Sequence, residues 1–133
     1  MANILVVDDE RIVRESLLSL LHSHGRHSGW AAGTAEEARE MAQSQSFDLL
    51  LIDWMLSDNV CGLQVASLVR ESTPSLPVIF LSGLISSDLQ SQVGSFRRSW
   101  FLSKPCDFME LLRTIELALQ LETTGGNNEP EVV

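Results

Sequence analysis

The chain has few of the residues that mark secreted, membrane-spanning or nucleic-acid-binding proteins. It has 133 residues and two cysteines, Cys61 and Cys106, which form no CxxC or metal-ligand pattern, so we expect a reduced, cytoplasmic protein. No apolar run approaches the roughly 20 residues that a transmembrane helix needs, and no signal peptide is visible. The formal net charge of −9 repels phosphate backbones and argues against direct nucleic-acid binding by this chain.

Two further features are missing or rare in this chain. No glycine-rich loop follows the first apolar run, which leaves a dinucleotide-binding domain without support. Lysine is almost missing, because only Lys104 among the nine basic residues is a lysine and the others are arginines.

Short, wholly apolar runs are the clearest positive signal. Ile4–Val7, Leu49–Ile52 and Val78–Leu81 are apolar at every position, which is typical of strands covered on both faces. Trp100–Leu102 is a weaker candidate strand, and Ser28–Ala32 is a poor one that suits the edge of a sheet.

Amphipathic stretches alternate with these runs and predict helices. Capping boxes are expected at Thr34 with Glu37 and at Asp107 with Glu110, and Gly25 is expected to stop the first helix. The predicted helices are Glu10–His24, a helix from Thr34 to about Gln43, Gly62–Ser72, a weak helix over Ser86–Val93, and a helix that follows Asp107. This alternation predicts an α/β domain, a parallel sheet with helices on both faces, over residues 1–121. Residues 122–133 are polar and are expected to be a disordered tail or the start of a linker.

Polar residues stand directly after four of the apolar runs. They are Asp8-Asp9, Asp53, Ser82-Gly83 and Ser103-Lys104-Pro105. Singly, the acids after the first run could be helix caps and Ser82-Gly83 could be turn chemistry. Together they meet at one edge of a parallel sheet, where ligands bind. Three close carboxylates favour a bound Mg²⁺, and a carboxylate beside Mg²⁺ and a lysine can accept a phosphoryl group.

Four segments resemble the receiver domain of two-component response regulators, the CheY-like family. They are Val6-Val7-Asp8-Asp9-Glu10, Leu51-Ile52-Asp53-Trp54-Met55-Leu56, Leu81-Ser82-Gly83 and Phe101-Leu102-Ser103-Lys104-Pro105. The presence of all four segments in this order is highly specific for this family. The resemblance implies a flavodoxin-like, doubly wound (βα)5 fold with a five-stranded parallel sheet in the order 2-1-3-4-5.

The resemblance also assigns roles to residues at matching positions. Asp53 matches the phospho-acceptor, and Lys104 and Gly83 match positions that face the phosphoryl group. Ser82 and Phe101 match the two switch positions. The Mg²⁺ ligands implied are Asp8, Asp9, Asp53 and the backbone carbonyl of Met55.

The implied donor is a phosphohistidine on a sensor histidine kinase or a phosphotransfer protein. The implied output surface is formed by the fourth helix, the fifth strand and the fifth helix. The implied recipient of the signal is a downstream protein or a C-terminal effector domain that this chain lacks. Such a domain catalyses its own phosphorylation and dephosphorylation but is not a turnover enzyme.

Two other functions stay open. A Mg²⁺-dependent phosphohydrolase with an aspartyl-phosphate intermediate would need an acid two residues after the nucleophile, where this chain has Met55. A phosphorylation-independent interaction domain would usually have lost an acid or the lysine, and none is lost here.

The chain departs from the family pattern at several positions. Ser57 stands where a proline is common, and Gly62 falls nine residues after Asp53 rather than eight, which indicates a one-residue insertion. Arg97-Arg98 and Trp100 are either a solvated pair beside a packed ring or a docking patch. Trp54 is expected to pack away from the site and Trp30 to lie at an edge. The remaining unusual group, His22, His24 and His27, is expected at the surface near the end of the first helix.

Overall fold

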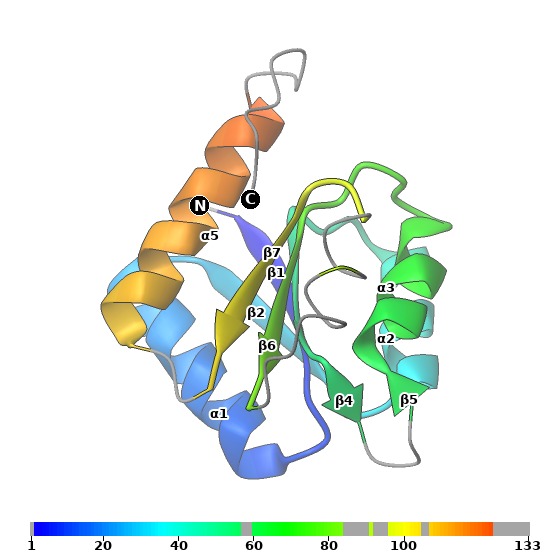
Figure 1. The fold of residues 1–133 in the computed structure, drawn as a ribbon, viewed down its shortest axis with the longest axis horizontal. Coiled ribbons are helices and arrows are strands. Elements are labelled where there is room, and N and C mark those ends of the chain that lie inside the picture. Colours follow the sequence, from blue (N-terminus) through cyan, green and yellow to red (C-terminus); the bar gives the residue numbers. More distant parts are fainter. Residues whose placement is uncertain (1, 57–59, 84–90, 92–95, 105–106, 124–133) are drawn as a thin grey trace.

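A computed structural model describes residues 2–56, 60–83, 91, 96–104 and 107–123 (Figure 1). Its main element is a five-stranded parallel sheet in the order β2-β1-β3-β6-β7, which confirms the predicted topology. The strands are β1 (Asn3–Val7), β2 (Ser28–Ala32), β3 (Leu49–Asp53), β6 (Val78–Ser82) and β7 (Ser99–Ser103). Each predicted strand is present, and the weak candidate at Ser28–Ala32 lies at an edge, as expected.

Helices cover both faces of this sheet. They are α1 (Arg11–Leu20) with a π-helical turn η1 (Leu21–Gly25), α2 (Ala35–Ser44), α3 (Gly62–Arg70) and α5 (Phe108–Thr123). The predicted helix over Ser86–Val93 lies outside the described residues except for Ser91. The predicted tail over residues 122–133 also lies outside them, except for Glu122 and Thr123, which belong to α5 and not to a tail. In the described part of the chain, no helix is long and apolar enough to cross a membrane.

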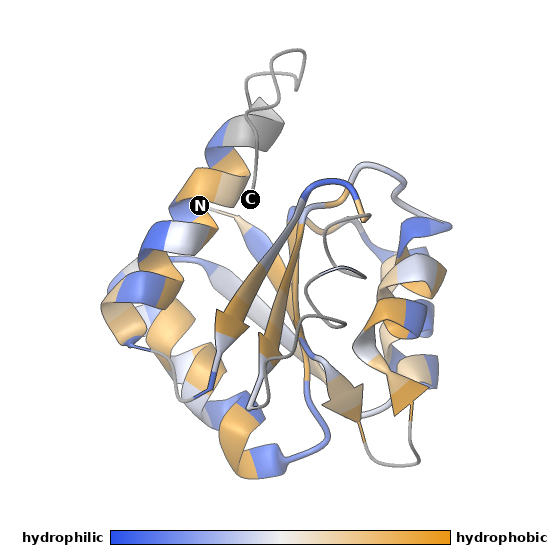
Figure 2. Cartoon of the chain, in the orientation of Figure 1, coloured by the Kyte–Doolittle hydropathy of each residue, from blue (hydrophilic) through white to orange (hydrophobic). Residues whose placement is uncertain are grey.

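Burial on both faces explains why the middle strands are apolar throughout. Along β3, Leu50 and Ile52 belong to the core under α2 and α3, whereas Leu49 and Leu51 belong to the core under α1 and α5. All four side chains are fully buried. In Figure 2 the arrows of β6 and β7 are hydrophobic, whereas the helices carry both colours. A polar side chain can therefore be accommodated only where one of these strands ends.

Helix caps were predicted well at N-termini and poorly at one C-terminus. The Glu37 amide donates to Thr34 Oγ1 (3.1 Å), and the Met109 amide donates to Asp107 Oδ1 (2.9 Å). The Glu37 carboxylate, however, accepts from the amide of Gly33 (2.7 Å). Gly25 does not stop the first helix in the expected way. Gly25 is the last residue of η1, and the residue after it, Arg26, takes the left-handed conformation (φ 59°) that ends the helix. The Arg26 amide donates to the Leu21 carbonyl.

A small antiparallel hairpin that the sequence pattern did not predict follows β3. It pairs β4 (Met55–Leu56) with β5 (Val60–Cys61), and the residues between the two strands lie outside the described part. Beyond it, the Gly62 amide donates to the Trp54 carbonyl at 2.5 Å. A Cβ on Gly62 would collide with the Asp53 carbonyl oxygen. Glycine at this position therefore lets α3 begin directly against the end of β3.

The tryptophans occupy different environments. Trp54 is buried and packs against Phe80 (ring centroids 5.3 Å apart) and Phe101 (6.1 Å), which confirms its predicted packing role. Trp30 is 42% exposed on the edge strand. Trp100 is buried in the core under α1 and α5, which confirms the packed ring and excludes this ring from a docking patch.

Arg70 fixes the segment that leads into β7. Its guanidinium donates to the carbonyl oxygens of Leu76, Arg97 and Arg98 at 2.6–3.2 Å and lies over the ring of Phe96, 4.1 Å from the centroid. The backbone of the Arg97-Arg98 pair is thus anchored by a third arginine.

His27 is not a surface residue, and the expectation for it was wrong. Its ring is only 6% exposed. Nδ1 accepts the Ala2 amide (3.1 Å), so the ring proton is assigned to Nε2, which lies 3.2 Å from Glu116 Oε2 on α5. The pattern around the histidines could not indicate this, because Glu116 is 89 residues away in sequence. His22 and His24 are exposed, as expected.

We predict that His27→Ala lowers the free energy of unfolding by about 1–3 kcal/mol, because the buried Ala2 amide loses its acceptor. Glu116→Gln should cost less than about 1 kcal/mol, since the Glu116 side chain is largely exposed. Urea unfolding at pH 7 measures both. His24→Ala is the matched control and should change stability by no more than about 0.5 kcal/mol. Equal losses in His27→Ala and His24→Ala would contradict the assigned contacts.

Candidate functional site

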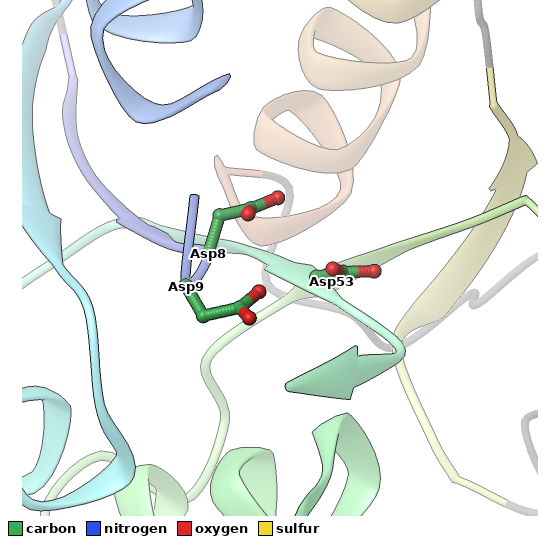
Figure 3. A group of neighbouring side chains, drawn as sticks. All are labelled: Asp8, Asp9 and Asp53. Atoms are coloured by element: carbon green, nitrogen blue, oxygen red, sulfur yellow. The ribbon is translucent and has the colours of Figure 1, made fainter. Parts of the chain in front are cut away.

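Three acidic side chains meet at the carboxyl edge of the sheet (Figure 3). Asp8 and Asp9 directly follow β1, and Asp53 ends β3. Because β1 and β3 are neighbours in the sheet, one carboxylate oxygen from each residue lies within 4.8 Å of the other two. In the observed strand order the chain reverses direction across the sheet between β1 and β3, so the acids lie at the topological switch point.

Asp8 is the most buried of the three, with a side chain only 1% exposed. Its Oδ1 accepts the Glu10 amide (2.9 Å), and its backbone carbonyl accepts from Arg14 Nη1 (2.7 Å). These contacts hold the start of α1 against the end of β1. Sequence reasoning missed the role of Arg14, because an arginine that binds a backbone carbonyl leaves no side-chain pattern to detect.

Lys104 lies between two of the carboxylates. Its Nζ is 3.3 Å from Asp8 Oδ2 and 3.4 Å from Asp53 Oδ2. Its backbone amide donates to the Ser82 carbonyl (2.7 Å), which aligns the end of β7 with the end of β6. Burial alone would lower the pKa of Lys104, but Asp8 and Asp53 outweigh this effect and raise the pKa above its ordinary value. Lys104 is therefore a cation at neutral pH.

The pKa of Asp53 is raised above its ordinary value. Burial of the carboxyl is the main cause, and the negative charge of Asp8 adds to it. Lys104 and the backbone amide of Met55 lower the pKa but do not cancel the rise. Burial therefore disfavours the ionised form of Asp53 even though the ammonium of Lys104 lies beside it.

The donor set of this cluster fits a hard divalent cation. Carboxylate and carbonyl oxygens are the ligands that Mg²⁺ takes, usually with retained water. Asp9 and Asp53 are only half-buried, which leaves the cluster open to solvent on one side. Met55, whose carbonyl was predicted as a further ligand, lies in β4 immediately after the acceptor strand, with its side chain 51% exposed.

The other predicted site residues lie at the ends of β6 and β7. Ser82 is buried and stands beside Ser103 in the strand register. A Cβ on Gly83 would meet no atom within 4 Å, so the space beside it is open. Phe101 is partly buried and packs against Trp54. The roles of these residues toward a phosphoryl group stay predictions, and Pro105 lies outside the described residues.

The fold and the cluster define a doubly wound α/β protein with an acidic site at the switch point of its sheet. Residues 4–116 match the family model of the response regulator receiver domain. The chain belongs to this family, and the resemblance inferred from the motifs is confirmed.

Proteins similar in sequence to this chain include response regulators. The chain is 31% identical over 126 residues to the response regulator protein PilR of Pseudomonas aeruginosa, a match that covers 95% of this chain and 28% of PilR. It is 29% identical over 119 residues to the response regulator receiver protein CpdR of Brucella abortus, covering 90% of this chain and 98% of CpdR. The chain spans only 28–56% of the length of the first relatives found, which extend beyond the receiver domain.

Solved structures show the same fold. A response regulator receiver protein from Sinorhizobium medicae superposes with a TM-score of 0.78 at 28% identity, covering 89% of this chain and 94% of that one. The chemotaxis protein CheY4 of Vibrio cholerae superposes with a TM-score of 0.82 at 25% identity, covering 90% and 99%.

We predict that Asp53→Asn increases the free energy of unfolding at pH 7 in buffer with a chelator. A carboxyl whose pKa is higher in the folded state than in the unfolded state favours folding when it is protonated. This contribution is lost as the pH rises through the folded-state pKa of Asp53. The neutral amide avoids that loss, so the advantage of the variant should shrink as the pH is lowered.

Urea unfolding of both proteins between pH 4 and pH 8 measures this effect. Asp107→Asn is the matched control, because Asp107 is an exposed helix cap and asparagine caps a helix equally well. A loss of stability in Asp53→Asn at pH 7 would contradict a raised pKa of Asp53 in the folded protein.

Proposed function

We propose that the chain is a phospho-acceptor signalling switch, in which Asp53 receives a phosphoryl group from a phosphohistidine in a Mg²⁺-dependent reaction. One observation carries the proposal. The Asp53 carboxylate lies within 4.8 Å of two further acids and 3.4 Å from the ammonium of Lys104. An acceptor, a cation-binding set and a fixed positive charge are thus combined at one point, which suits phosphoryl transfer. Membership in the receiver family supports the same function.

The chemistry is a substitution at phosphorus. A carboxylate oxygen of Asp53 forms a bond to phosphorus while the bond from phosphorus to the donor imidazole nitrogen breaks. The imidazole nitrogen takes up a proton, and the donor returns to neutral histidine. Because the transition state is loose and highly charged, the protein contributes positioning and charge neutralisation. Lys104 supplies a point charge that is already held beside the attacking carboxylate.

Asp8, Asp9, Asp53 and the Met55 carbonyl would hold the cation. Bound there, Mg²⁺ would neutralise charge on the acids and on the phosphoryl oxygens. Asp8 is fixed by the Glu10 amide, and Asp53 by the end of β3, so neither acid has to reorganise far.

We propose that the phosphoryl group is sensed at the ends of β6 and β7. Ser82 would bind a phosphoryl oxygen beside Gly83, and Phe101 would change its packing against Trp54. The output would pass to α5, β7 and the segment between β6 and β7, and from there to a downstream protein or a further domain. The donor would be a sensor histidine kinase or a phosphotransfer protein in the cytoplasm.

We expect that acetyl phosphate with Mg²⁺ adds one phosphoryl group to the wild type and none to Asp53→Asn, because the amide cannot form the acyl phosphate. Intact-mass spectrometry at neutral pH measures the adduct. Asp107→Asn should be modified like the wild type. Modification of Asp53→Asn at the wild-type level would place the acceptor elsewhere, and modification in excess chelator would remove the cation from the mechanism.

Lys104→Met should slow this modification about 100-fold, which is typical of removing one preorganised group that stabilises transition-state charge. Lys104→Arg should also slow it, by about tenfold, because a planar guanidinium cannot take the place of a compact ammonium between two carboxylates. Stopped samples analysed by mass spectrometry give the rates. Arg39→Lys, an exchange at an exposed surface position, is the control. A wild-type rate in Lys104→Arg would show that only the charge matters.

A further inference from the structure

Among the three clustered acids, Asp9 has the least support from contacts of its own side chain. Asp8 is held by the Glu10 amide and by Lys104, and Asp53 also pairs with Lys104. Within the described part of the chain, the Asp9 carboxylate has no hydrogen-bond or ion-pair partner. In Figure 3 it nevertheless points toward Asp53. The direction of this carboxylate is therefore set by the backbone that carries it.

The backbone between Asp8 and Asp9 is held by Arg14. This residue is half-buried on α1, and its Nη1 donates to the Asp8 carbonyl oxygen at 2.7 Å. That oxygen belongs to the planar peptide unit whose nitrogen is the amide nitrogen of Asp9. On the other side of Asp8, its own amide donates to the Ala32 carbonyl at 3.2 Å. Both peptide planes that flank Asp8 are thus fixed, and the second of them sets the direction in which the Asp9 side chain leaves the chain.

Gly33, between β2 and α2, allows the Arg14 guanidinium to occupy this position. A Cβ on Gly33 would lie 2.9 Å from Arg14 Nη1 and 3.4 Å from its Cζ, so the guanidinium packs directly against the glycine. The Glu37 carboxylate lies beside the same point (3.6 Å) and accepts the Gly33 amide at 2.7 Å. Its negative charge favours the guanidinium at this place. A side chain on residue 33 would push the guanidinium, the end of a flexible side chain, away from the Asp8 carbonyl.

We propose that Arg14 is a positioning residue of the acidic site, whose guanidinium packs against Gly33, fixes the Asp8–Asp9 peptide and thereby directs the Asp9 carboxylate toward a bound divalent cation. The proposal rests on the proposed function in one respect, since it needs a cation that Asp9 and Asp53 hold together. Arg14 is not itself a ligand, because a guanidinium has no acceptor atom. Loss of a group that orients a metal ligand weakens metal binding by about 10–100-fold.

The affinity for Mn²⁺ tests this role without a phosphodonor. Mn²⁺ shares the preference of Mg²⁺ for octahedral oxygen ligands, and the electron paramagnetic resonance signal of the free ion gives the dissociation constant. Arg14→Ala should bind Mn²⁺ about tenfold more weakly than the wild type, and Gly33→Ala about threefold more weakly. Arg11→Ala is the matched control, because Arg11 is an exposed cation on the same helix that pairs only with Glu15 among the described residues. It should not weaken binding.

The sign of the change separates positioning from charge. Removal of a positive charge near the acids would by itself strengthen cation binding, so weaker binding by Arg14→Ala reports the loss of positioning. Gly33→Ala keeps every charge and displaces only the guanidinium. In an Arg14→Ala background it has nothing to displace and should have no further effect. If Arg14→Ala does not fold, judged by circular dichroism, the weaker binding expected of Gly33→Ala carries the test by itself.

Acetyl phosphate separates this role from the proposed function. In Arg14→Ala the Mg²⁺ concentration that gives half the maximal rate of modification should rise about tenfold. The maximal rate should stay within about twofold of the wild type, because Asp53 and Lys104 are unchanged. The positioning role is overturned by unchanged or tighter Mn²⁺ binding in Arg14→Ala, by unchanged binding in Gly33→Ala, or by an equal effect of Gly33→Ala in both backgrounds. A wild type that binds Mn²⁺ but takes no phosphoryl group would instead reject the proposed function.

Discussion

β1, β3 and β6 are buried on both faces, and this burial decides where chemistry can take place. Their interiors admit no polar side chain, because neither face offers water or a hydrogen-bonding partner. The carboxyl ends of the same strands are open, and parallel pairing brings those ends together. Asp8, Asp53 and Ser82 therefore converge without any loop being specially shaped to carry them.

The convergence has an electrostatic consequence. Three acids and one lysine form a cluster with excess negative charge, and burial of the carboxyl, with the charge of Asp8 adding to it, raises the pKa of Asp53. A cluster of this kind is costly for folding in the absence of a cation and favourable for binding one. The burial that disfavours the ionised acceptor also leaves the excess negative charge poorly solvated, so the free energy of folding and the proposed binding of a cation depend on the same residues.

The fold and the acidic site could largely be predicted, because both follow from local pattern. Continuous apolar runs specified the strands to within about one residue, and the residues after them specified Asp8, Asp9, Asp53 and Lys104. Features that depend on residues far apart in the sequence could not be predicted. The contact of His27 with Glu116 joins residues 89 apart in the sequence. The Arg70 guanidinium donates hydrogen bonds to backbone carbonyl oxygens in two different loops. The hairpin of β4 and β5 is too short to leave a periodic signal.

The amino-acid sequence by itself determined the family, the order of the strands and the residues at their ends, since hydrophobic period and motif spacing are properties of the chain alone. Tertiary structure decided which of those residues touch. It placed Lys104 between Asp8 and Asp53 rather than in solvent, buried Trp100 and His27, and left Ile12 and Phe108 exposed beside the site. Burial and contact depend on how helices pack across the sheet, and that packing exists only once the chain has folded.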